Sequence, residues 1–295
     1  MPSLPLVVRS PAKINLFLKI TGKRPDGYHN IATLFQMIDL CDVMTFRPWP
    51  RGGIRVTCTD RSIPAKKNLA YLAAKMLWRS GLPGVWINIE KNIPSGAGLG
   101  GGSSNAAAAL YWLNRIWGLG RSEKALRARA KKLGADVPFF LFGPRAWATG
   151  VGDRLKAVPV FEKFYVLLVK PRVKISTKNI YAEFDRELTS SVQSVRIPAR
   201  VDRCFITLDG MGGLLANDLV KVVEKKYPII KEIKKRLEKF DCKGVMLSGS
   251  GSAVFAIFKK RREVRKAFEN IKNGSWWCAT AKAVDSMNHM KCQGG

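Results

Sequence analysis

The chain has 295 residues, and its 51 Lys and Arg against 22 Asp and Glu give a formal net charge of +29. Hydrophobic residues make up 46 % of the chain, which excludes a disordered protein, and its Pro and Gly lack the period of collagen. No apolar run approaches the roughly 18 residues that a membrane-spanning helix needs, so no membrane partner is expected. The length suits one large or two medium domains with buried cores.

The cysteines and histidines argue against a zinc or redox site. Six cysteines are scattered along the chain, and none stands in a CxxC pair. Two histidines, His29 and His289, are too few for a metal site with several imidazole ligands. The start of the chain lacks a basic leader with a long apolar run, so no secretory signal is indicated. We therefore expect a cytoplasmic protein with reduced thiols.

The positive charge has three possible meanings: a nucleic-acid partner, a phosphorylated small molecule, or a basic surface without a specific ligand. Residues 231–239 place apolar side chains at helical spacing, which predicts a solvated amphipathic helix. Residues 259–262 are all basic and are expected to cap the exposed end of a strand. Because no helix-turn-helix, zinc-finger or RNP motif is present, no specific nucleic-acid partner is expected. A basic field nevertheless attracts anionic substrates.

The first half of the chain alternates strands with helices. Two strands are expected on either side of Pro11, and the helix after the glycine-rich loop is expected to have Ser103 or Ser104 as its N-cap. The expected strands are 6–8, 14–20, 33–40, 43–46 and 85–89. The expected helices are 68–78, 103–117 and 123–133. A short apolar run covers 137–142.

The second half repeats this alternation. A strand is expected at 166–169 and a polar surface connection at 189–203, followed by helices at 218–226 and 229–240 and strands at 244–247, 253–258 and 279–284. Strands that alternate with helices indicate a mixed α/β (α+β) fold. We expect two domains, residues 1–158 and residues 159–295.

A glycine-rich loop lies between the strand at 85–89 and the helix that follows. Five glycines fall between residues 96 and 102, and glycine lets a backbone adopt positive φ and approach a ligand closely. The N-terminus of a helix offers free N–H groups and partial positive charge, so the combination suits phosphate. A dinucleotide-binding loop needs an acidic residue after a second strand, and a Walker A loop needs Lys before Ser; neither is present. The protein-kinase motifs are also absent.

Three residues outside the loop suggest phosphoryl transfer. Lys13 and Asn15 are two residues apart on a strand and therefore share a face. Asp136 precedes an apolar run and, taken alone, is better explained as the N-cap of a following helical turn. A carboxylate that accepts a hydroxyl proton beside a lysine that stabilises developing charge is a suitable pair for this reaction.

Four ordered motifs resemble those of the GHMP kinases, the family of galactokinase, homoserine kinase and mevalonate kinase. Residues 94–104 (PSGAGLGGGSS) resemble the second signature of that family and residues 247–255 (LSGSGSAVF) the third. Residues 10–16 (SPAKINL), with 22–29 (GKRPDGYH) and 134–140 (GADVPFF), resemble the branch whose substrate is a methylerythritol that carries a cytidine diphosphate group.

The resemblance implies a two-domain fold with an active site in the cleft, and ATP-dependent phosphorylation of the substrate's 2-hydroxyl in non-mevalonate isoprenoid synthesis. Asp136 matches the general base, Lys13 its electrostatic partner and Asn15 a residue that orients substrate. Residues that match the ATP site are Asn68, Lys91, Pro94, Gly96, Gly98, Leu99, Gly100, Gly101, Gly102, Ser103, Ser104 and Asn105. Residues that match the cytidine site are Tyr28, His29, Thr177 and Tyr181, and residues 217–219 match a structural motif.

Mg²⁺ is the expected companion of ATP, with no protein ligand assigned because the ion often uses phosphate and water oxygens. Two alternatives remain within the same fold: a kinase for another small alcohol, which should lack the motif at residues 25–29, and a non-catalytic relative, which should lack Lys13 or Asp136. A nucleic-acid-binding protein is a third. The sequence indicates no oligomeric state.

Overall fold

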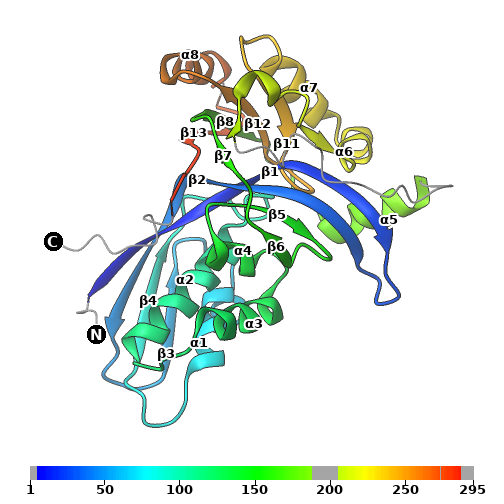
Figure 1. The fold of residues 1–295 in the computed structure, drawn as a ribbon. Helices are drawn as coiled ribbons and strands as arrows, with labels where there is room; N and C mark the ends of the chain where they lie inside the picture. The colour runs from blue at the N-terminus through cyan, green and yellow to red at the C-terminus, as the bar shows by residue number, and fades with distance from the viewer. Residues whose placement is uncertain (1–4, 188–204, 273, 287–295) are drawn as a thin grey trace.

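The computed structural model describes residues 5–187, 205–272 and 274–286. The expected polar connection at 189–203, His289 and the chain end lie outside these described residues. Two sheets, each covered by helices, form the molecule (Figure 1). No helix among the described residues is long and apolar enough to cross a membrane.

The first sheet is built on a long antiparallel pair. β1 (Leu6–Lys23) pairs with β2 (His29–Pro48), and the sheet order is β10-β1-β2-β4-β3, with β5 on β2 and β6 on β5. The other strands are β3 (Ile54–Cys58), β4 (Val85–Glu90), β5 (Arg145–Thr149), β6 (Arg154–Lys156) and β10 (Ala216–Asn217).

The expected break at Pro11 is wrong, because β1 continues through it. Pro11 lies opposite Cys41, and the next pair is Ala12 with Ile38, so β2 carries a bulge at this point. Proline lacks an N–H and is tolerated where a ladder is irregular. For the same reason the two strands expected at 33–40 and 43–46 are one strand, β2.

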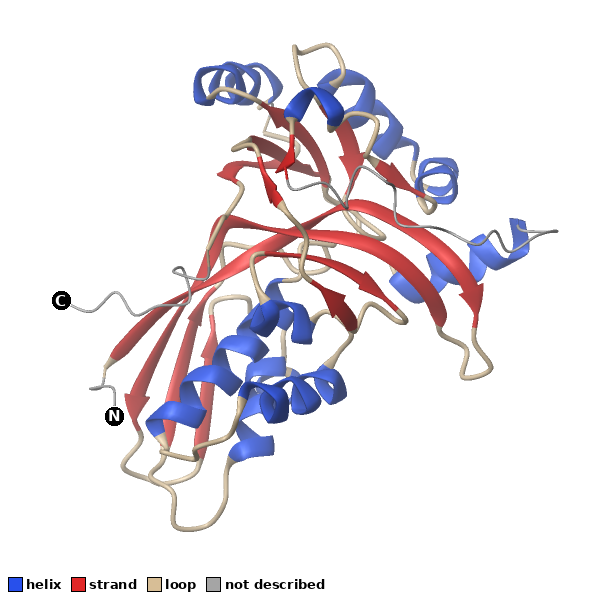
Figure 2. Ribbon diagram, viewed as in Figure 1, coloured by secondary structure: helices blue, strands red, loops and turns tan. Residues whose placement is uncertain are grey.

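Four helices cover one face of the first sheet (Figure 2). Asn68 caps α1 with its side chain and Ser122 caps α3, as expected for these residue types. Four consecutive alanines from Ala106 to Ala109 are buried in α2, where small side chains permit close packing on the sheet. The helices are α1 (Leu69–Leu77), α2 (Gly101–Ile116), α3 (Glu123–Leu133) and α4 (Val137–Phe142), preceded by a 3₁₀ turn, η1 (Ala65–Lys67).

The second sheet has the order β11-β12-β8-β13 and is antiparallel throughout. Its strands are β8 (Tyr165–Lys170), β11 (Gly244–Leu247), β12 (Val254–Phe258) and β13 (Trp277–Lys282). Its helices are α5 (Thr177–Glu187), α6 (Val220–Lys226), α7 (Pro228–Leu237) and α8 (Arg261–Ile271). β7 (Val160–Phe161) pairs with β9 (Phe205–Ile206) in a separate ribbon, and η2 (Leu208–Gly210) follows.

Residues 259–262 do not only cap a strand, because α8 begins there. Lys260 is its N-cap residue, and the Lys260 backbone N–H donates to the Glu263 carboxylate at 3.1 Å. The one acid in the first turn of α8, Glu263, is thus placed where a helix start favours negative charge.

One apolar cluster joins the two sheets. It contains Ile14 and Leu34 from the first sheet, Leu99 from the glycine loop, and Leu168 and Phe255 from the second sheet. β10 also crosses from the second half of the chain to pair with β1. We propose that the two domains divide at 158/159, between β6 and β7. β10 then belongs to the second domain by sequence and to the first sheet by its pairing with β1. The glycine loop therefore lies in the seam between the sheets.

Candidate active site

Lys13 and Asn15 project from β1 into the seam and contact each other, as their spacing predicts. Nζ of Lys13 donates to Oδ1 of Asn15 at 2.7 Å, and Nδ2 of Asn15 donates to Thr33 at 2.8 Å. Both side chains are almost fully buried. The Lys13 ammonium also lies 5.1 Å from the centre of the Phe35 ring. These contacts hold the lysine in one orientation.

Asp136 occupies the N-cap position of α4 but does not use its side chain as a cap. Its Oδ2 instead lies 3.3 Å from Nζ of Lys13, and a third of its side chain remains exposed. The carboxylate thus has one oxygen near a buried cation and remains accessible from the seam. This is the geometry that a proton acceptor beside a charged partner requires.

The glycine loop packs against a second loop, between β11 and β12. Ser248 donates from its hydroxyl to the Gly98 carbonyl at 2.9 Å, and Ala253 N–H donates to the Ala97 carbonyl at 3.0 Å. Gly98 has φ +77°, and a Cβ there would lie 2.1 Å from the Ser248 carbonyl oxygen. Only glycine permits this approach. The loop is thereby fixed between the two sheets.

The helix after the loop begins earlier than predicted, at Gly101, so neither Ser103 nor Ser104 is its N-cap. Gly100 takes that position with φ +70°. The hydroxyl of Ser104 lies inside the first turn, where it accepts a hydrogen bond from Ser10 at 2.7 Å. The N–H groups of residues 101–103 have no partner within the helix, because the first α-helical hydrogen bond runs from Ser104 to Gly100. They form a site suited to an anion.

A buried carboxylate supports the loop from behind. Asp42 is fully buried on β2 and accepts backbone hydrogen bonds from Asn92 and Ile93, each at 2.8 Å. Lys91 forms an ion pair with it, and Asn105 donates from its Nδ2 at 3.0 Å. Two residues expected at the ATP site are therefore brought together by an acid that the sequence reading missed.

The other expected ATP-site residues lie around the same helix start. Pro94 opens the loop, Gly96 is exposed with φ +65°, and Gly102 stands in the first turn of α2. Asn68 begins α1, where its Oδ1 accepts from the Ala70 N–H at 2.9 Å. A Cβ at Gly102 would approach Leu69 of α1 at 3.6 Å, which places the starts of the two helices side by side.

The aromatic residues expected to bind cytidine form a group at the other end of β1 and β2. Tyr28 is two-thirds exposed, whereas His29 and Tyr181 have ring centres 4.8 Å apart. Nε2 of His29 is 2.6 Å from Oδ1 of Asp185, and Lys23 reaches Oδ2 at 2.8 Å. The structure thus brings together His29 and Tyr181 and adds Asp185 of α5.

Two pKa shifts describe this group. Burial, and the nearby charges of Asp136 and Asp218, raise the pKa of the Tyr181 hydroxyl well above its usual range. Burial opposes ionisation of Asp185, but hydrogen bonds from Lys23 and His29 outweigh it and lower the pKa of that carboxyl. The influence of Asp136 on Tyr181 also shows that the aromatic group lies near the Lys13–Asp136 pair.

Thr177 and the 217–219 motif contact the loop between β11 and β12. The hydroxyl of Thr177 is 2.7 Å from that of Ser250. Asn217 donates to the carbonyls of Leu247 and Gly249, so it supports this loop, as a structural motif would. Thr177 therefore joins the start of α5 to the loop that also holds Gly98.

Sequence reasoning missed Asp42, Asp185 and Thr33, and it quoted Ser248 within residues 247–255 without giving it a role. Two acids, Asp39 and Asp42, stand within the apolar stretch 33–46, and an acid in such a stretch was the signal for Asp42, since an unpaired carboxylate is rarely buried. Nothing in the sequence indicated a role for Asp185, because α5, the helix that carries it, was not predicted. No group of three or more His, Cys, Asp or Glu side chains that could hold a metal ion occurs among the described residues.

Comparison with known proteins identifies this architecture. A model of the GHMP kinase N-terminal domain matches residues 68–144, and one of the GHMP kinase C-terminal domain matches residues 206–274. A homoserine kinase structure from Cytophaga hutchinsonii, 18 % identical, superimposes with a TM-score of 0.70 over 97 % of both chains, which shows the shared fold. The fold is that of the GHMP kinases, a class of small-molecule kinases.

Closer relatives narrow the class. A protein of Syntrophotalea carbinolica named 4-diphosphocytidyl-2-C-methyl-D-erythritol kinase is 43 % identical over 95 % of this chain and 98 % of its own length. The protein of the same name from Geobacter metallireducens is 41 % identical over 94 % and 97 %. A crystal structure of 4-(cytidine 5'-diphospho)-2C-methyl-D-erythritol kinase is 32 % identical, with a TM-score of 0.81 over 94 % and 99 %. The chain belongs to the 4-diphosphocytidyl-2-C-methyl-D-erythritol kinase family.

Proposed function

We propose that this kinase transfers the γ-phosphoryl group of ATP to the 2-hydroxyl of 4-diphosphocytidyl-2-C-methyl-D-erythritol, giving the 2-phosphate and ADP. The observation that carries the proposal is the 3.3 Å pair of Lys13 and Asp136 beside the glycine loop. Phosphoryl transfer depends mainly on positioning and on stabilising charge.

Asp136 accepts the proton of the attacking hydroxyl in this proposal. The Asp136 side chain makes no capping hydrogen bond to α4, so an oxygen of its carboxylate can accept the proton. Lys13 is buried, and its ammonium group lies between Asp136 and Asn15. It stabilises the negative charge that builds up between the attacking oxygen and the phosphoryl group. Asn15 keeps the lysine in place and orients the substrate.

ATP binds with its phosphates at the glycine loop and the start of α2. Three free N–H groups and the helix dipole support this placement. Lys91 stands behind the same turn, since a Cβ added at Gly101 would lie 3.0 Å from its Nζ. Asn68 and Asn105 complete the nucleotide site, and Ser103 offers a hydroxyl at the helix start.

Cytidine binds between the aromatic residues. Tyr28 presents an exposed ring, and Tyr181 offers a second plane next to His29. Stacking on aromatic rings and hydrogen bonds to a base edge are the usual means of holding a nucleobase. Thr177 contacts the phosphate groups of this substrate.

Mg²⁺ accompanies ATP in the proposal. Mg²⁺ is often held by phosphate and water oxygens, so the proposal assigns it no protein ligand. When bound, the ion neutralises charge on the phosphates. The chain's own part is to hold those phosphates through the N–H groups of α2.

ADP release by the purified protein tests the proposal. ATP and Mg²⁺ are supplied with 4-diphosphocytidyl-2-C-methyl-D-erythritol or with the same compound lacking the cytidine group. Turnover with only the cytidylated compound supports both the reaction and the aromatic site. Turnover with neither, despite measurable ATP binding, would support a kinase for another alcohol or a non-catalytic relative.

A further inference from the structure

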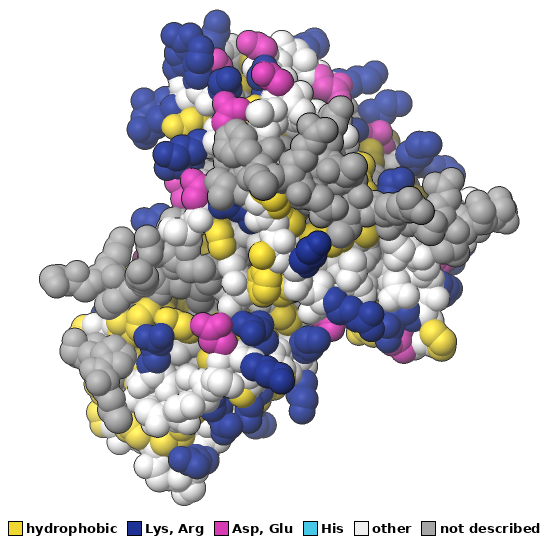
Figure 3. Space-filling view, in the orientation of Figure 1, with side chains coloured by type: hydrophobic (Ala, Val, Ile, Leu, Met, Phe, Trp, Pro, Cys, Tyr) yellow, Lys and Arg dark blue, Asp and Glu magenta, His cyan; other side chains and the backbone are white. Residues whose placement is uncertain are grey.

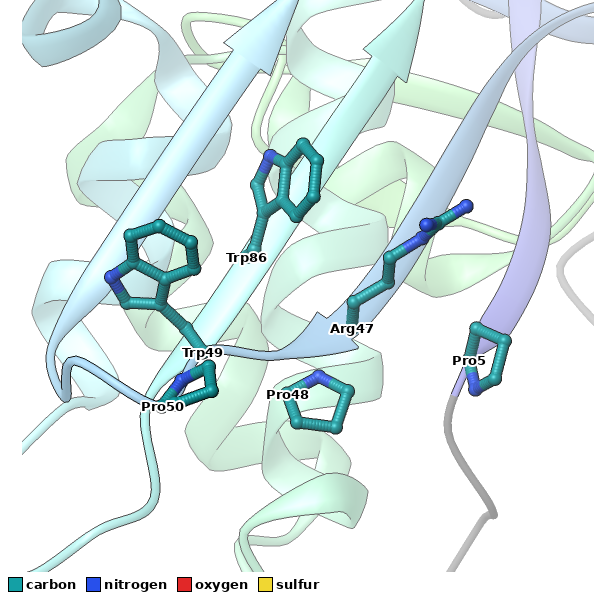
Figure 4. A pocket seen from close by; sticks show the side chains of 6 residues that line it. All are labelled: Pro5, Arg47, Pro48, Trp49, Pro50 and Trp86. Atoms are coloured by element: carbon teal, nitrogen blue, oxygen red, sulfur yellow. The ribbon is translucent and has the colours of Figure 1, made fainter.

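One face of the first sheet carries tryptophans and arginines that the proposed reaction does not use. Trp86 alternates on β4 with Val85 and Ile87, which are buried beneath the helices, so Trp86 points to the opposite face. Figure 4 shows Trp86, Trp49 and Arg47 in front of the strands, with helices behind.

The side chains on this face form a stacked array. In the sheet register, Arg47 of β2 and Arg55 of β3 flank Trp86. The Arg55 guanidinium carbon lies 4.6 Å from the ring centre of Trp49 and 4.9 Å from that of Trp86. Arg47 is 5.7 Å from Trp86, and Arg51 is 5.6 Å from Trp49. We call these five residues the Trp–Arg face.

The turn beside the array borders a shallow, open hollow of about 400 Å³. Pro5, Pro48 and Pro50 line it together with Arg47 and the two tryptophans. Trp49 N–H donates to the Gly84 carbonyl at 3.0 Å, and a Cβ at Gly84 would lie 2.3 Å from the Trp49 carbonyl oxygen. Backbone packing that only glycine permits therefore fixes Trp49 beside Trp86.

The charge of this face is unbalanced. Among the described residues, none of the three guanidinium groups is paired with a carboxylate. The chain as a whole carries +29, and on the face visible in Figure 3 basic side chains are more widespread than acidic ones. An anionic partner would neutralise this charge.

We propose that the Trp–Arg face binds single-stranded nucleic acid without sequence preference. Bases stack on indole rings and on guanidinium planes, and the same guanidinium groups bind phosphate. Beside the array, Thr57 of β3 donates to Asn88 of β4 at 2.8 Å, so a polar pair lies at its edge. An open sheet with aromatic and basic residues is a form that such binding takes.

The shape of the face argues against a lipid surface. Membrane anchoring uses aromatic and aliphatic side chains that project from the protein. Trp49 and Trp86 are half-buried, and Nε1 of Trp86 is held by Thr57 at 2.8 Å. Among the described residues the large apolar side chains that stand exposed are Tyr28 and Trp78, and neither belongs to the Trp–Arg face.

The Trp–Arg face is far from the reacting groups. Lys13 pairs with Met37 on β2, and Arg47 lies ten positions further along that strand, a separation of about 30 Å at the usual strand rise. Substitutions in the Trp–Arg face are therefore expected to leave kinase activity unchanged. The proposal of nucleic-acid binding does not depend on the proposed reaction.

Fluorescence anisotropy with a labelled oligouridylate of about 12 nucleotides tests the proposal. The double variant Arg47→Gln/Arg55→Gln is compared with Lys231→Gln/Lys235→Gln, which removes the same charge from exposed positions on α7. We expect the first to weaken binding about tenfold and to reduce the salt slope by about 1.4, from two phosphate contacts. The control changes affinity less than about twofold.

Trp86→Leu separates stacking from charge. It retains all three arginines, so we expect about tenfold weaker binding with the salt slope unchanged. The melting temperature confirms that each variant is folded. Four results would each overturn the proposal. Two concern the variants: equal losses of affinity in both double variants, or unaltered binding by Trp86→Leu. The other two are absence of oligonucleotide binding and preferential binding to vesicles of anionic lipid.

Discussion

Nζ of Lys13 lies 3.3 Å from Oδ2 of Asp136, and the stem of the same lysine supports the glycine loop. Lys13 N–H donates to the Leu99 carbonyl at 2.9 Å, and a Cβ at Gly100 would lie 3.0 Å from Lys13 Cγ. The proton acceptor, its charged partner and the phosphate loop are therefore parts of one packed unit. Small changes in any of them should affect the reaction.

Asp136→Asn should reduce kcat by about 10²- to 10⁴-fold, because the amide cannot accept the hydroxyl proton. KM for both substrates should remain near the wild-type value, since the change is isosteric and the side chain is partly exposed. Steady-state kinetics and the melting temperature check this. A variant with wild-type kcat would remove Asp136 from the mechanism.

Gly98→Ala and Gly96→Ala form a matched pair in the phosphate loop. Both positions have positive φ, which costs other residues about 1–2 kcal/mol. Only Gly98 faces a backbone oxygen at 2.1 Å, whereas nothing lies within 4 Å of a Cβ at Gly96. Gly98→Ala should therefore lower the melting temperature and raise the ATP KM far more. Equal effects would show that the contact with Ser248 is unimportant.

Tyr181→Ala should raise KM for the cytidylated substrate about tenfold, which corresponds to the loss of one base-stacking contact. The ATP KM should not change, because the ring packs on His29 and not on the glycine loop. Tyr181→Phe retains the ring and serves as the control. A change in the ATP KM instead would reverse the assignment of the two sites.

Asp42→Asn should destabilise the protein by about 3–5 kcal/mol, because it leaves the buried Lys91 ammonium without its partner. The urea-unfolding midpoint measures this loss. Asp60→Asn is a control, since the Asp60 carboxylate binds Ser95 of the same loop but lies at the surface. Equal stability of the two variants would show that the Asp42 cluster has no supporting role.

The lowered pKa of Asp185 makes an acid-dependent contribution to stability. A carboxyl with a depressed pKa stabilises the fold above its unfolded pKa of about 3.9, and that contribution is lost as the pH falls through the folded value. The difference in unfolding free energy between wild type and Asp185→Asn should shrink as the pH falls from about 5 to 3. A constant difference for Asp185→Asn would contradict the assignment.

Local signals predicted much of the fold. The helices expected at 68–78 and 123–133 correspond to α1 and α3, which Asn68 and Ser122 cap, and the strands expected at 85–89 and 166–169 correspond to β4 and β8. Lys13 and Asn15 were placed on one face by spacing alone, and they are in contact.

Long-range packing decided what was missed. β1 continues through Pro11 because β2 supplies a bulge, and α2 begins at Gly101 because Gly100 can adopt positive φ. α5 and α8 are highly charged helices whose apolar faces are narrow, and without α5 nothing indicated that Asp185 meets His29. The role of Asp42 depends on Lys91 and Asn105, and only the folded chain brings these two residues beside it.

The most direct test of the central claim is the identity of the phosphorylated product. The protein is incubated with ATP, Mg²⁺ and 4-diphosphocytidyl-2-C-methyl-D-erythritol, and ³¹P NMR follows the phosphate groups. We predict one new phosphomonoester on the 2-position, formed in step with ADP and absent with Asp136→Asn. Loss of ATP without that signal, or a phosphate at another hydroxyl, would contradict the proposed reaction.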